Sequence, residues 1–136
     1  MPLVPDPSAI AGLAFPDEDS RPALAVIEAI GADLAIVPTL FWFEIRNILL
    51  MGERRKRIAP HQTTLFLANL AVLPFEIDGQ PHEAAVLSLA RQHTLTVYDA
   101  AYLELAQRRN LPLATLDHAL MRAAKATGVV VWKPAG

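Results

Sequence analysis

The sequence contains no cysteine, so disulfide bonds, zinc–thiolate centres and thiol catalysis are excluded. It also lacks any apolar run of the roughly 18 residues that a membrane-spanning helix needs. The longest apolar stretch, Leu34 to Phe43, is interrupted by Pro38 and Thr39, and the first residues lack the basic start of a secretion signal. These absences predict a soluble, cytoplasmic protein that has no membrane partner.

Two further absences narrow the function. The six glycines form neither a GxGxxG nor a P-loop pattern, so the sequence gives no support for a nucleotide cofactor. Neither sign of charge is in large excess, because the net charge is −2, and this argues against a general polyanion binder. The charges are nevertheless unevenly placed. Seven acids and one base precede Arg46, whereas the remainder, Arg46 included, holds seven acids and eleven bases.

Apolar residues are abundant, at 53% of the 136 residues against 19% charged residues. A chain of this length buries about 68% of the surface that its unfolded form exposes, which is enough for one core. No internal repeat, low-complexity segment or long linker divides the chain, so a single domain over residues 1–136 is predicted. The apolar excess also indicates a surface that a partner or a second copy covers.

Short apolar runs alternate with longer helical patterns, which is typical of an α/β fold around a parallel sheet. Strands are expected at Leu3–Val4, Leu34–Val37, Val72–Ile77, Leu95–Val97, Leu113–Leu116 and Val129–Trp132. Helices are expected at Ser8–Phe15, Ser20–Ile30, Thr39–Arg55, His61–Leu70, Pro81–Gln92, Ala100–Arg109 and His118–Thr127.

Three aspartates, Asp6, Asp99 and Asp117, each come shortly after an expected strand and just before an expected helix. Ligands of open α/β sheets bind beyond the carboxyl ends of the strands, so these side chains are expected at one edge of the sheet. A different interpretation is open for each aspartate taken singly, because Asp is a preferred N-cap of helices.

Glu44 is expected on the apolar face of its helix, which it shares with Phe41 and Ile45. A carboxylate on such a face needs a cation or hydrogen-bond donors, because its desolvation is costly. Asn47 lies three residues further on and could orient Glu44. The alternatives are that Glu44 is a rim residue paired with an arginine and that Asn47 is an ordinary surface amide.

Several carboxylates at one edge repel one another, by about 4 kcal/mol for two charges ~4 Å apart at an effective dielectric constant of ~20. A multivalent cation relieves this repulsion. With oxygen ligands alone the cation is expected to be hard, Mg²⁺ or Mn²⁺. A phosphodiester is the natural substrate of such a site, because the metal neutralises its oxygens and activates a water molecule.

Four sequence blocks resemble the PIN-domain family, and within it the VapC-like toxins of type II toxin–antitoxin systems. They appear in the family's order and span most of the chain. The blocks are DPSAIA at 6–11, FEIRNIL at 43–49, YDAAYLELA at 98–106 and LATLDHAL at 113–120.

The resemblance implies a three-layer α/β/α fold with a central, mostly parallel sheet of about five strands. It implies a Mg²⁺- or Mn²⁺-dependent endoribonuclease that cleaves RNA by metal-activated water, is inhibited by a cognate antitoxin and forms a homodimer. The catalytic and metal-binding residues would be Asp6, Glu44, Asp99 and Asp117. Ser8 and Thr115 would support them, although local capping or strand packing also accounts for these two residues.

The chain departs from the family pattern in two places. Asp6 stands between Pro5 and Pro7, and proline gives up a ladder hydrogen bond, so the first strand is expected to be short or to end at Val4. No acid follows Asp117, so a second metal would be held weakly or only with substrate. The alternative function is a catalytically silent PIN-like module that binds RNA or a partner protein.

Basic residues cluster at the end of the helix that carries Glu44. Phosphate contacts with RNA come from such charges. The candidate contacts are Arg46, Arg54, Arg55, Lys56 and Arg57. For the last four the alternative is a solvated helix end that the helix dipole favours, and for Arg46 it is a salt bridge.

Overall fold

The computed structural model describes residues 1–135 of the chain. Four short parallel strands cross its middle, namely β1 (Val4–Pro5), β2 (Ala35–Pro38), β3 (Phe75–Asp78) and β4 (Leu113–Ala114). β1 pairs with β4 and β2 pairs with β3, and a parallel bridge between Leu3 and Ala35 joins the two pairs. The sheet order is therefore β3-β2-β1-β4, with β1 in an inner position.

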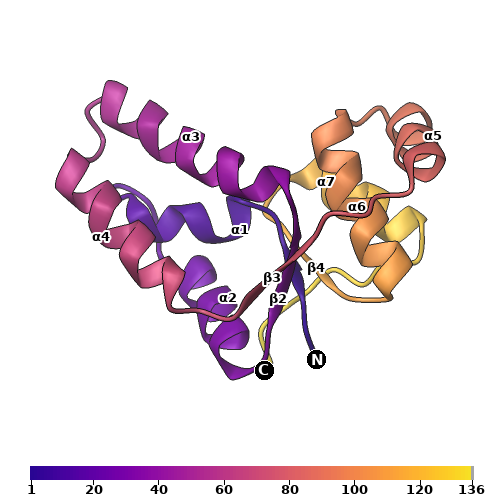
Figure 1. Cartoon of the computed structure of the whole chain (residues 1–136), viewed down its shortest axis with the longest axis horizontal. Helices are drawn as coiled ribbons and strands as arrows, with labels where there is room; N and C mark the ends of the chain where they lie inside the picture. The colour runs from indigo at the N-terminus through magenta and orange to yellow at the C-terminus, as the bar shows by residue number, and fades with distance from the viewer. Residues whose placement is uncertain (136) are drawn as a thin grey trace.

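Helices cover both faces of this sheet, as Figure 1 shows, with α1 to α4 on one side and α5 to α7 on the other. The α/β/α architecture that the sequence predicts is confirmed. All the expected helices form, with ends shifted by a few residues. They are α1 (Ser8–Ala11), α2 (Arg21–Ala32), α3 (Leu40–Arg54), α4 (Pro60–Ala71), α5 (Glu83–His93), α6 (Val97–Arg109) and α7 (His118–Ala126), and a short 3₁₀ helix, η1 (Gly12–Ala14), extends α1.

The expected count of about five strands is corrected to four in the described residues. The segment expected at Val129–Trp132 lies beside β4 but contributes a single bridge, between Val131 and Leu113. Val130 next to it is 68% exposed, so little apolar burial supports a longer pairing. Pro134 follows closely and cannot donate to a ladder, which also limits the strand.

The strand expected at Leu95–Val97 is wrong. Val97 begins helix α6, and the hydroxyl of Thr96 caps that helix by accepting a hydrogen bond from the backbone N–H of Asp99 at 3.1 Å. Three residues are too few for periodicity to distinguish a strand from the start of a helix, and the capping threonine decides between them. Asp99 therefore lies in the first turn of α6 rather than after a strand.

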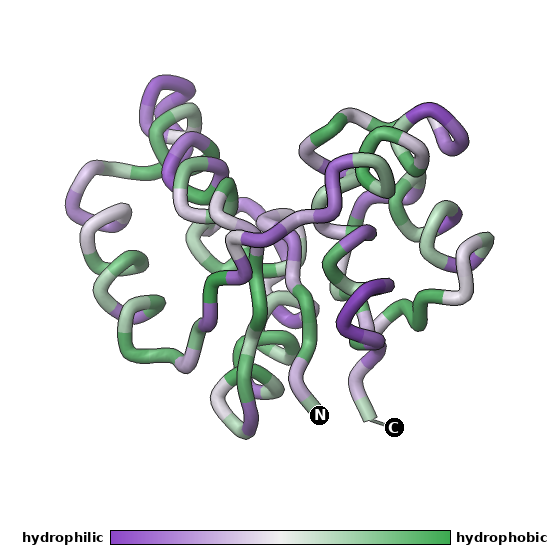
Figure 2. The backbone as a smooth tube through the Cα atoms, turned by 45° about the vertical axis from the view of Figure 1, so that its right-hand side comes forward, coloured by the Kyte–Doolittle hydropathy of each residue, from purple (hydrophilic) through white to green (hydrophobic). Residues whose placement is uncertain are grey.

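The core forms where the helices meet the sheet. Residues of β1, β2 and β4 are buried throughout, whereas β3 is a partly exposed edge strand. Figure 2 shows hydrophobic colouring along the central strands and along parts of the helices, with hydrophilic colouring at several outer turns. Ile36, Ile45 and Leu113 are each at most 2% exposed, and burying such a side chain contributes about 1.5–3 kcal/mol to stability.

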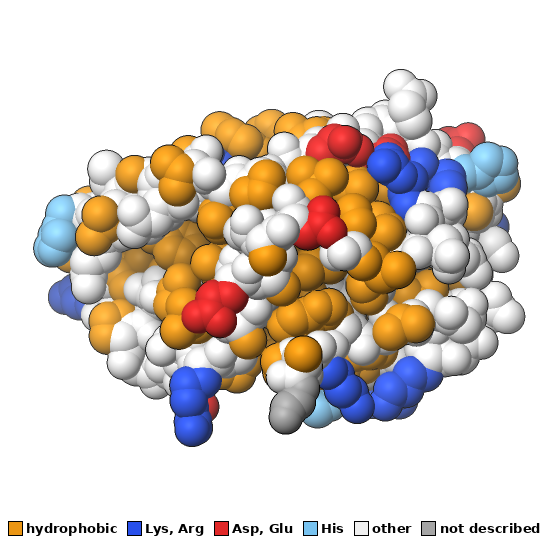
Figure 3. Space-filling view, turned by 90° about the horizontal axis from the view of Figure 1, so that it is seen from below, with side chains coloured by type: hydrophobic (Ala, Val, Ile, Leu, Met, Phe, Trp, Pro, Cys, Tyr) orange, Lys and Arg blue, Asp and Glu red, His pale blue; other side chains and the backbone are white. Residues whose placement is uncertain are grey.

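The two ends of the sheet differ in character. Seen from the side of the amino ends of β1 and β2, the surface is largely apolar, with charged side chains dispersed between the hydrophobic ones (Figure 3). The candidate acidic residues lie at the opposite end, in the loops after β1 and β4 and in the first two turns of α3 and the first turn of α6. No helix in residues 1–135 combines the length and the apolar character that crossing a membrane requires.

Candidate active site

The four predicted acids come from separate elements near the carboxyl ends of the strands. Asp6 directly follows β1, Asp117 follows β4 after two residues, and Glu44 lies in the second turn of α3, which β2 leads into. Asp99 lies in the first turn of α6. Because β1 is an inner strand between β2 and β4, Asp6 occupies the central position of this set.

Asp6 is only 4% exposed, and protein donors hold both of its carboxylate oxygens. The hydroxyl of Ser8 donates to Oδ1 at 2.6 Å, and the backbone N–H of Ala9 donates to the same oxygen at 3.2 Å. The hydroxyl of Thr115 donates to Oδ2 at 2.7 Å. Burial nevertheless raises the pKa of Asp6, and the charge of Asp99 raises it further.

The prolines beside Asp6 are compatible with the sheet because of the alternation of hydrogen bonds along β1. The N–H groups of Val4 and Asp6 point towards β4 and bond to the carbonyls of Pro112 and Ala114 at 2.9 and 3.0 Å. The nitrogen of Pro5 faces the other neighbour, β2, where pairing ends. The short first strand that the sequence predicts is therefore confirmed, and Asp6 remains anchored to β4.

Glu44 is half-buried and contacts a tyrosine that the sequence analysis did not select. The hydroxyl of Tyr102 donates to Oε1 of Glu44 at 2.5 Å. Desolvation raises the pKa of Glu44, and the charges of Asp99 and Asp6 raise it further. Tyr102 lies three residues after Asp99, so it shares a face of α6 with that acid, and this spacing is the signal that could have identified it.

Asn47 does not orient Glu44 as predicted. It is exposed on α3, and the hydrogen bond to Glu44 comes from Tyr102 instead. The alternative prediction, that Glu44 is a rim residue paired with an arginine, is also wrong, because no arginine in residues 1–135 forms a salt bridge with Glu44. A side chain of the neighbouring helix therefore takes the role that a local residue was expected to fill.

Asp99 and Asp117 differ in how far the capping interpretation applies. Thr96 caps α6, so Asp99 is not the cap, and desolvation together with the charge of Asp117 raises its pKa. Asp117 is the N-cap of α7, since its Oδ1 accepts from the backbone N–H of Leu120 at 2.9 Å. Asp117 is exposed, and its other oxygen has no hydrogen-bond partner in residues 1–135.

The pKa shifts link the acids into one electrostatic group. Asp117 acts on Asp99, Asp99 acts on Asp6 and Glu44, and Asp6 acts on Glu44, each by raising the pKa of its neighbour. Within residues 1–135 none of the four forms a salt bridge, so no protein cation balances their charges. A set of carboxylate oxygens without a balancing cation has the chemistry that Mg²⁺ or Mn²⁺ prefers.

The four acids do not form a preorganised metal-binding site in this structure. Among the described residues no group of three or more His, Asp or Glu side chains is arranged to hold a metal ion. Protein donors occupy both oxygens of Asp6 and one oxygen each of Glu44 and Asp117. Binding a cation here therefore requires side-chain adjustment or a contribution from the bound substrate.

The predicted RNA contacts fall into two sets. Arg54, Arg55 and Lys56 are exposed at the end of α3, roughly 15 Å along the helix from Glu44 at about 1.5 Å per residue. Arg57 is instead engaged in the protein, because it donates to Asp17 and Glu18 at 2.9 and 2.7 Å. Its role as an RNA contact is thus not supported by its placement.

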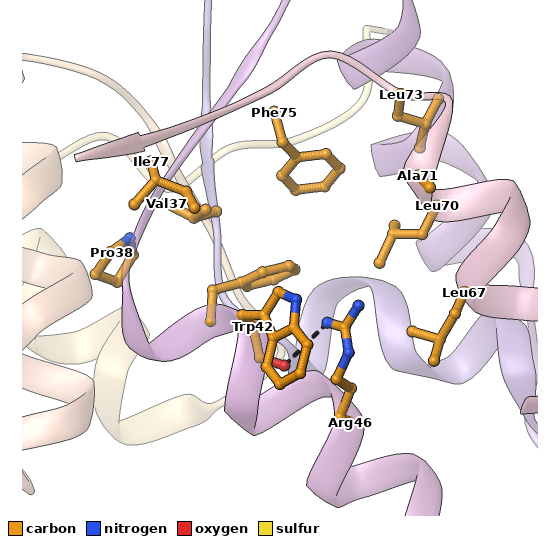
Figure 4. A pocket seen from close by; sticks show the side chains of 11 residues that line it. Val37, Pro38, Trp42, Arg46, Leu67, Leu70, Ala71, Leu73, Phe75 and Ile77 are labelled. Carbon is orange, nitrogen blue, oxygen red and sulfur yellow. Dashed lines mark hydrogen bonds between the residues drawn. The ribbon is translucent and has the colours of Figure 1, made fainter. Parts of the chain in front are cut away.

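Arg46 lines an apolar cavity between α3, α4 and the β2–β3 edge (Figure 4). Its guanidinium lies 3.7 Å from the centroid of the Trp42 ring, and its Nη1 donates to the Trp42 carbonyl at 3.1 Å. The cavity has a volume of about 230 Å³ and no acidic residue in its lining. It is a feature separate from the acidic site.

Comparison with known proteins agrees with the fold, and the matched region includes all four sequence blocks. The sequence profile of the PIN domain family matches residues 3–126. The chain is 35% identical over 128 residues to Ribonuclease VapC3 of Pyrobaculum aerophilum, a match that covers 88% of this chain and 92% of the relative.

Two solved structures have the same fold. The PAE2754 protein of Pyrobaculum aerophilum superposes with a TM-score of 0.67 at 25% identity, covering 96% of this chain and 92% of that one. FitAcB of Neisseria gonorrhoeae superposes with a TM-score of 0.67 at 16% identity, covering 98% of each chain. Since the family profile spans nearly the whole sequence and the relative is similar over most of its length, this chain belongs to the PIN domain family.

Proposed function

We propose that this protein is a VapC-like endoribonuclease, the toxin of a type II toxin–antitoxin pair, that hydrolyses RNA phosphodiester bonds with the help of Mg²⁺ or Mn²⁺. The observation that carries the proposal is the group of four carboxylates at the carboxyl ends of the strands, Asp6, Glu44, Asp99 and Asp117. None of them forms a salt bridge in residues 1–135, and burial together with the charges of neighbouring acids raises the pKa of Asp6, Glu44 and Asp99. The 35% identity to a protein named Ribonuclease VapC3 supports the same activity.

The four acids have different parts in this proposal. Asp6 is the fixed ligand, because Ser8 and Thr115 hold its carboxylate in one orientation. Glu44, Asp99 and Asp117 would complete the metal site. When bound there, the cation supplies charge neutralisation at the phosphate and lowers the pKa of the attacking water. The carboxylates around the cation would also help to remove the proton that the water loses.

The basic end of α3 is the proposed track for the RNA backbone. Arg54, Arg55 and Lys56 are exposed and form no salt bridge within residues 1–135. Phosphate contacts of this kind contribute affinity without reading the sequence of the RNA.

We further propose that a cognate antitoxin and a second copy of the chain are partners of this protein in the cytoplasm. Large apolar side chains remain exposed near the acidic edge, which is unusual for a monomer. Phe43 of α3 and Val97 of α6 are among them, at 65% and 51% exposed.

A second candidate function is a catalytically silent PIN-like module that binds RNA or a partner protein. The observation in its favour is that no group of acids in residues 1–135 is arranged as a finished metal site. The module would bind RNA with the same basic residues and leave it intact.

Incubation of the purified protein with mixed cellular RNA and Mn²⁺ distinguishes the two functions. We expect cleavage that EDTA abolishes and that the Asp6→Ala and Asp99→Ala variants lack. Glu28→Gln, a change at an exposed acid of α2, is the matched control and should cleave normally. Binding of RNA without cleavage in the presence of Mn²⁺ supports the silent module, and undiminished cleavage by both variants contradicts the acidic site.

A further inference from the structure

Tyr102 is the largest of the side chains that the described fold buries completely. It lies on α6, one turn beyond Asp99, on the helix that packs against β1 and β2. Its ring is therefore enclosed by the core, and the position of its hydroxyl is set by packing around the ring rather than by contact with solvent.

The hydroxyl is the one polar group of this side chain, and a buried tyrosine hydroxyl needs a hydrogen-bond partner. Its partner is Oε1 of Glu44, at 2.5 Å and 58 positions away in the sequence. A bond of this length between a hydroxyl and a carboxylate is of the short, charge-assisted kind. A side chain anchored in the core therefore donates a hydrogen bond to one carboxylate oxygen of Glu44 at the acidic edge.

Glu44 would otherwise have considerable freedom. It is half-buried, its side chain rotates about three bonds, and residues 1–135 provide no other hydrogen bond to it. The charges of Asp6 and Asp99 repel its carboxylate and favour rotamers directed towards solvent. The bond from Tyr102 opposes this displacement at Oε1 and leaves Oε2 without a protein partner in the described residues.

We propose that Tyr102 is a positioning residue of the metal site: its buried hydroxyl holds Oε1 of Glu44, so that this carboxylate would be oriented to hold a divalent cation together with Asp6 and Asp99. This inference rests on the proposed function. Tyr102 does not itself contact the metal or the RNA. It reduces the freedom of Glu44 before the cation binds, in the way that partners of metal ligands generally do.

Tyr102→Phe removes the hydroxyl oxygen and keeps the ring. Isothermal titration calorimetry with Mn²⁺ alone measures the effect without any RNA or cleavage. We expect Tyr102→Phe to bind Mn²⁺ about 10-fold more weakly than the wild type. Tyr98→Phe is the matched control, since Tyr98 is the other tyrosine, lies on the same helix and is 61% exposed. It should bind Mn²⁺ as the wild type does.

A double-mutant cycle shows whether Tyr102 acts through Glu44. In a Glu44→Ala background the Tyr102→Phe change should cause no further loss of Mn²⁺ affinity. The inference is overturned if Tyr102→Phe lowers Mn²⁺ affinity just as much in the Glu44→Ala background. It is also overturned if the single Tyr102→Phe variant keeps wild-type affinity for Mn²⁺, or if Tyr98→Phe loses as much affinity as Tyr102→Phe. If the wild type cleaves RNA in these cases, the inference fails and the proposed function stands. A wild type that binds no Mn²⁺ by itself but cleaves RNA also overturns the inference alone, whereas a wild type that neither binds Mn²⁺ nor cleaves RNA overturns both.

A third measurement keeps the chain's packing nearly unaltered and so does not depend on the folding of a variant. The sequence has two tyrosines, so labelling with 3-fluorotyrosine gives two fluorine resonances, which Tyr98→Phe assigns. Addition of diamagnetic Mg²⁺ should shift the resonance of Tyr102, because a cation on Glu44 draws charge from the accepting oxygen. A resonance that does not move when Mg²⁺ saturates the site contradicts the inference.

Discussion

The hydroxyl of Thr115 donates a hydrogen bond to Oδ2 of Asp6 at 2.7 Å, across 109 positions of sequence. The Thr115 hydroxyl oxygen, Oγ1, also accepts a hydrogen bond from the backbone N–H of Asp117 at 3.0 Å. One threonine therefore connects the acid that follows β1 with the turn that carries the acid after β4. This connection joins the two strands at the edge where the candidate chemistry lies.

Thr115→Val tests this connection, because valine has nearly the shape of threonine but cannot form either bond. We expect about a 10-fold loss of Mn²⁺ affinity and a loss of about 1–2 kcal/mol in the free energy of unfolding. Cleavage of RNA over a Mn²⁺ titration and urea denaturation provide the two measurements. Thr64→Val, at an exposed threonine of α4, is the control and should change neither quantity by much.

Asp99→Asn is expected to abolish cleavage and to stabilise the metal-free protein. Desolvation and the charge of Asp117 raise the pKa of Asp99 above its usual 3.8, so the ionised carboxylate destabilises the fold at neutral pH. The gain should be about 0.5–1 kcal/mol after allowance for partial solvent screening.

The sign of this effect also fixes its pH dependence. A raised pKa in the folded state means that the stability of the wild type falls as pH rises above 3.8 through the raised value. In urea denaturation at pH 7, the free energy of unfolding of Asp99→Asn should therefore be higher than that of the wild type. This difference in free energy should vanish below pH 3.8. A variant that is less stable than the wild type at pH 7 without metal would show that Asp99 is not electrostatically strained.

Asp78 is expected to have the opposite pH dependence. Its side chain is 7% exposed and bonds to Arg108 and Arg109, and these contacts, chiefly the hydrogen bond from Arg108, lower its pKa from 3.8 to about 2. Its contribution to stability is complete above pH 3.8 and is lost as pH falls through about 2. The free energy of unfolding of Asp78→Asn should thus be about 1–2 kcal/mol lower than that of the wild type at pH 5. Equal deficits at pH 5 and pH 2 would contradict this assignment.

The basic residues of α3 should separate into RNA-binding and structural groups. Replacing Arg54, Arg55 and Lys56 with alanine should raise KM for RNA and flatten the dependence of log affinity on log salt by about 2, with little change in stability. Arg57→Gln should lower the stability and leave KM for RNA and the salt dependence unchanged. The reason is that Arg57 forms salt bridges with Asp17 and Glu18 and lies over the ring of Phe15. A matching salt effect in both variants would show that Arg57 also contacts RNA.

Gly52→Ala should destabilise the protein, although alanine usually improves a helix by about 1 kcal/mol relative to glycine. A Cβ atom at Gly52 would collide with Cε1 of Phe15, a buried ring that has little room to move. We expect a loss of about 1–3 kcal/mol in thermal or urea unfolding. Gly31→Ala is the control, because its Cβ would lie 3.9 Å from the nearest side-chain atom of Leu73. That change in α2 should be neutral or stabilising.

The helices and most strands were predictable because their signals are local. Apolar periodicity and capping residues act within a few positions, and Asp117, for example, caps α7 as its neighbours suggest. The order of the four motifs also allowed the family and its acids to be recognised. The strand wrongly expected at Leu95–Val97 shows the limit of this reasoning, since a segment of three residues is too short to show a period and the cap at Thr96 decides that a helix begins there.

The sequence by itself determined most of the element types, the family and the acids that supply negative charge. Only the tertiary structure decided which groups meet those acids: Tyr102 rather than Asn47 beside Glu44, and Asp17 and Glu18 beside Arg57. The physical reason is that helix and strand formation depends on neighbours along the chain. A buried hydroxyl or an unbalanced charge is instead satisfied by whatever the packing of distant segments brings within hydrogen-bond distance.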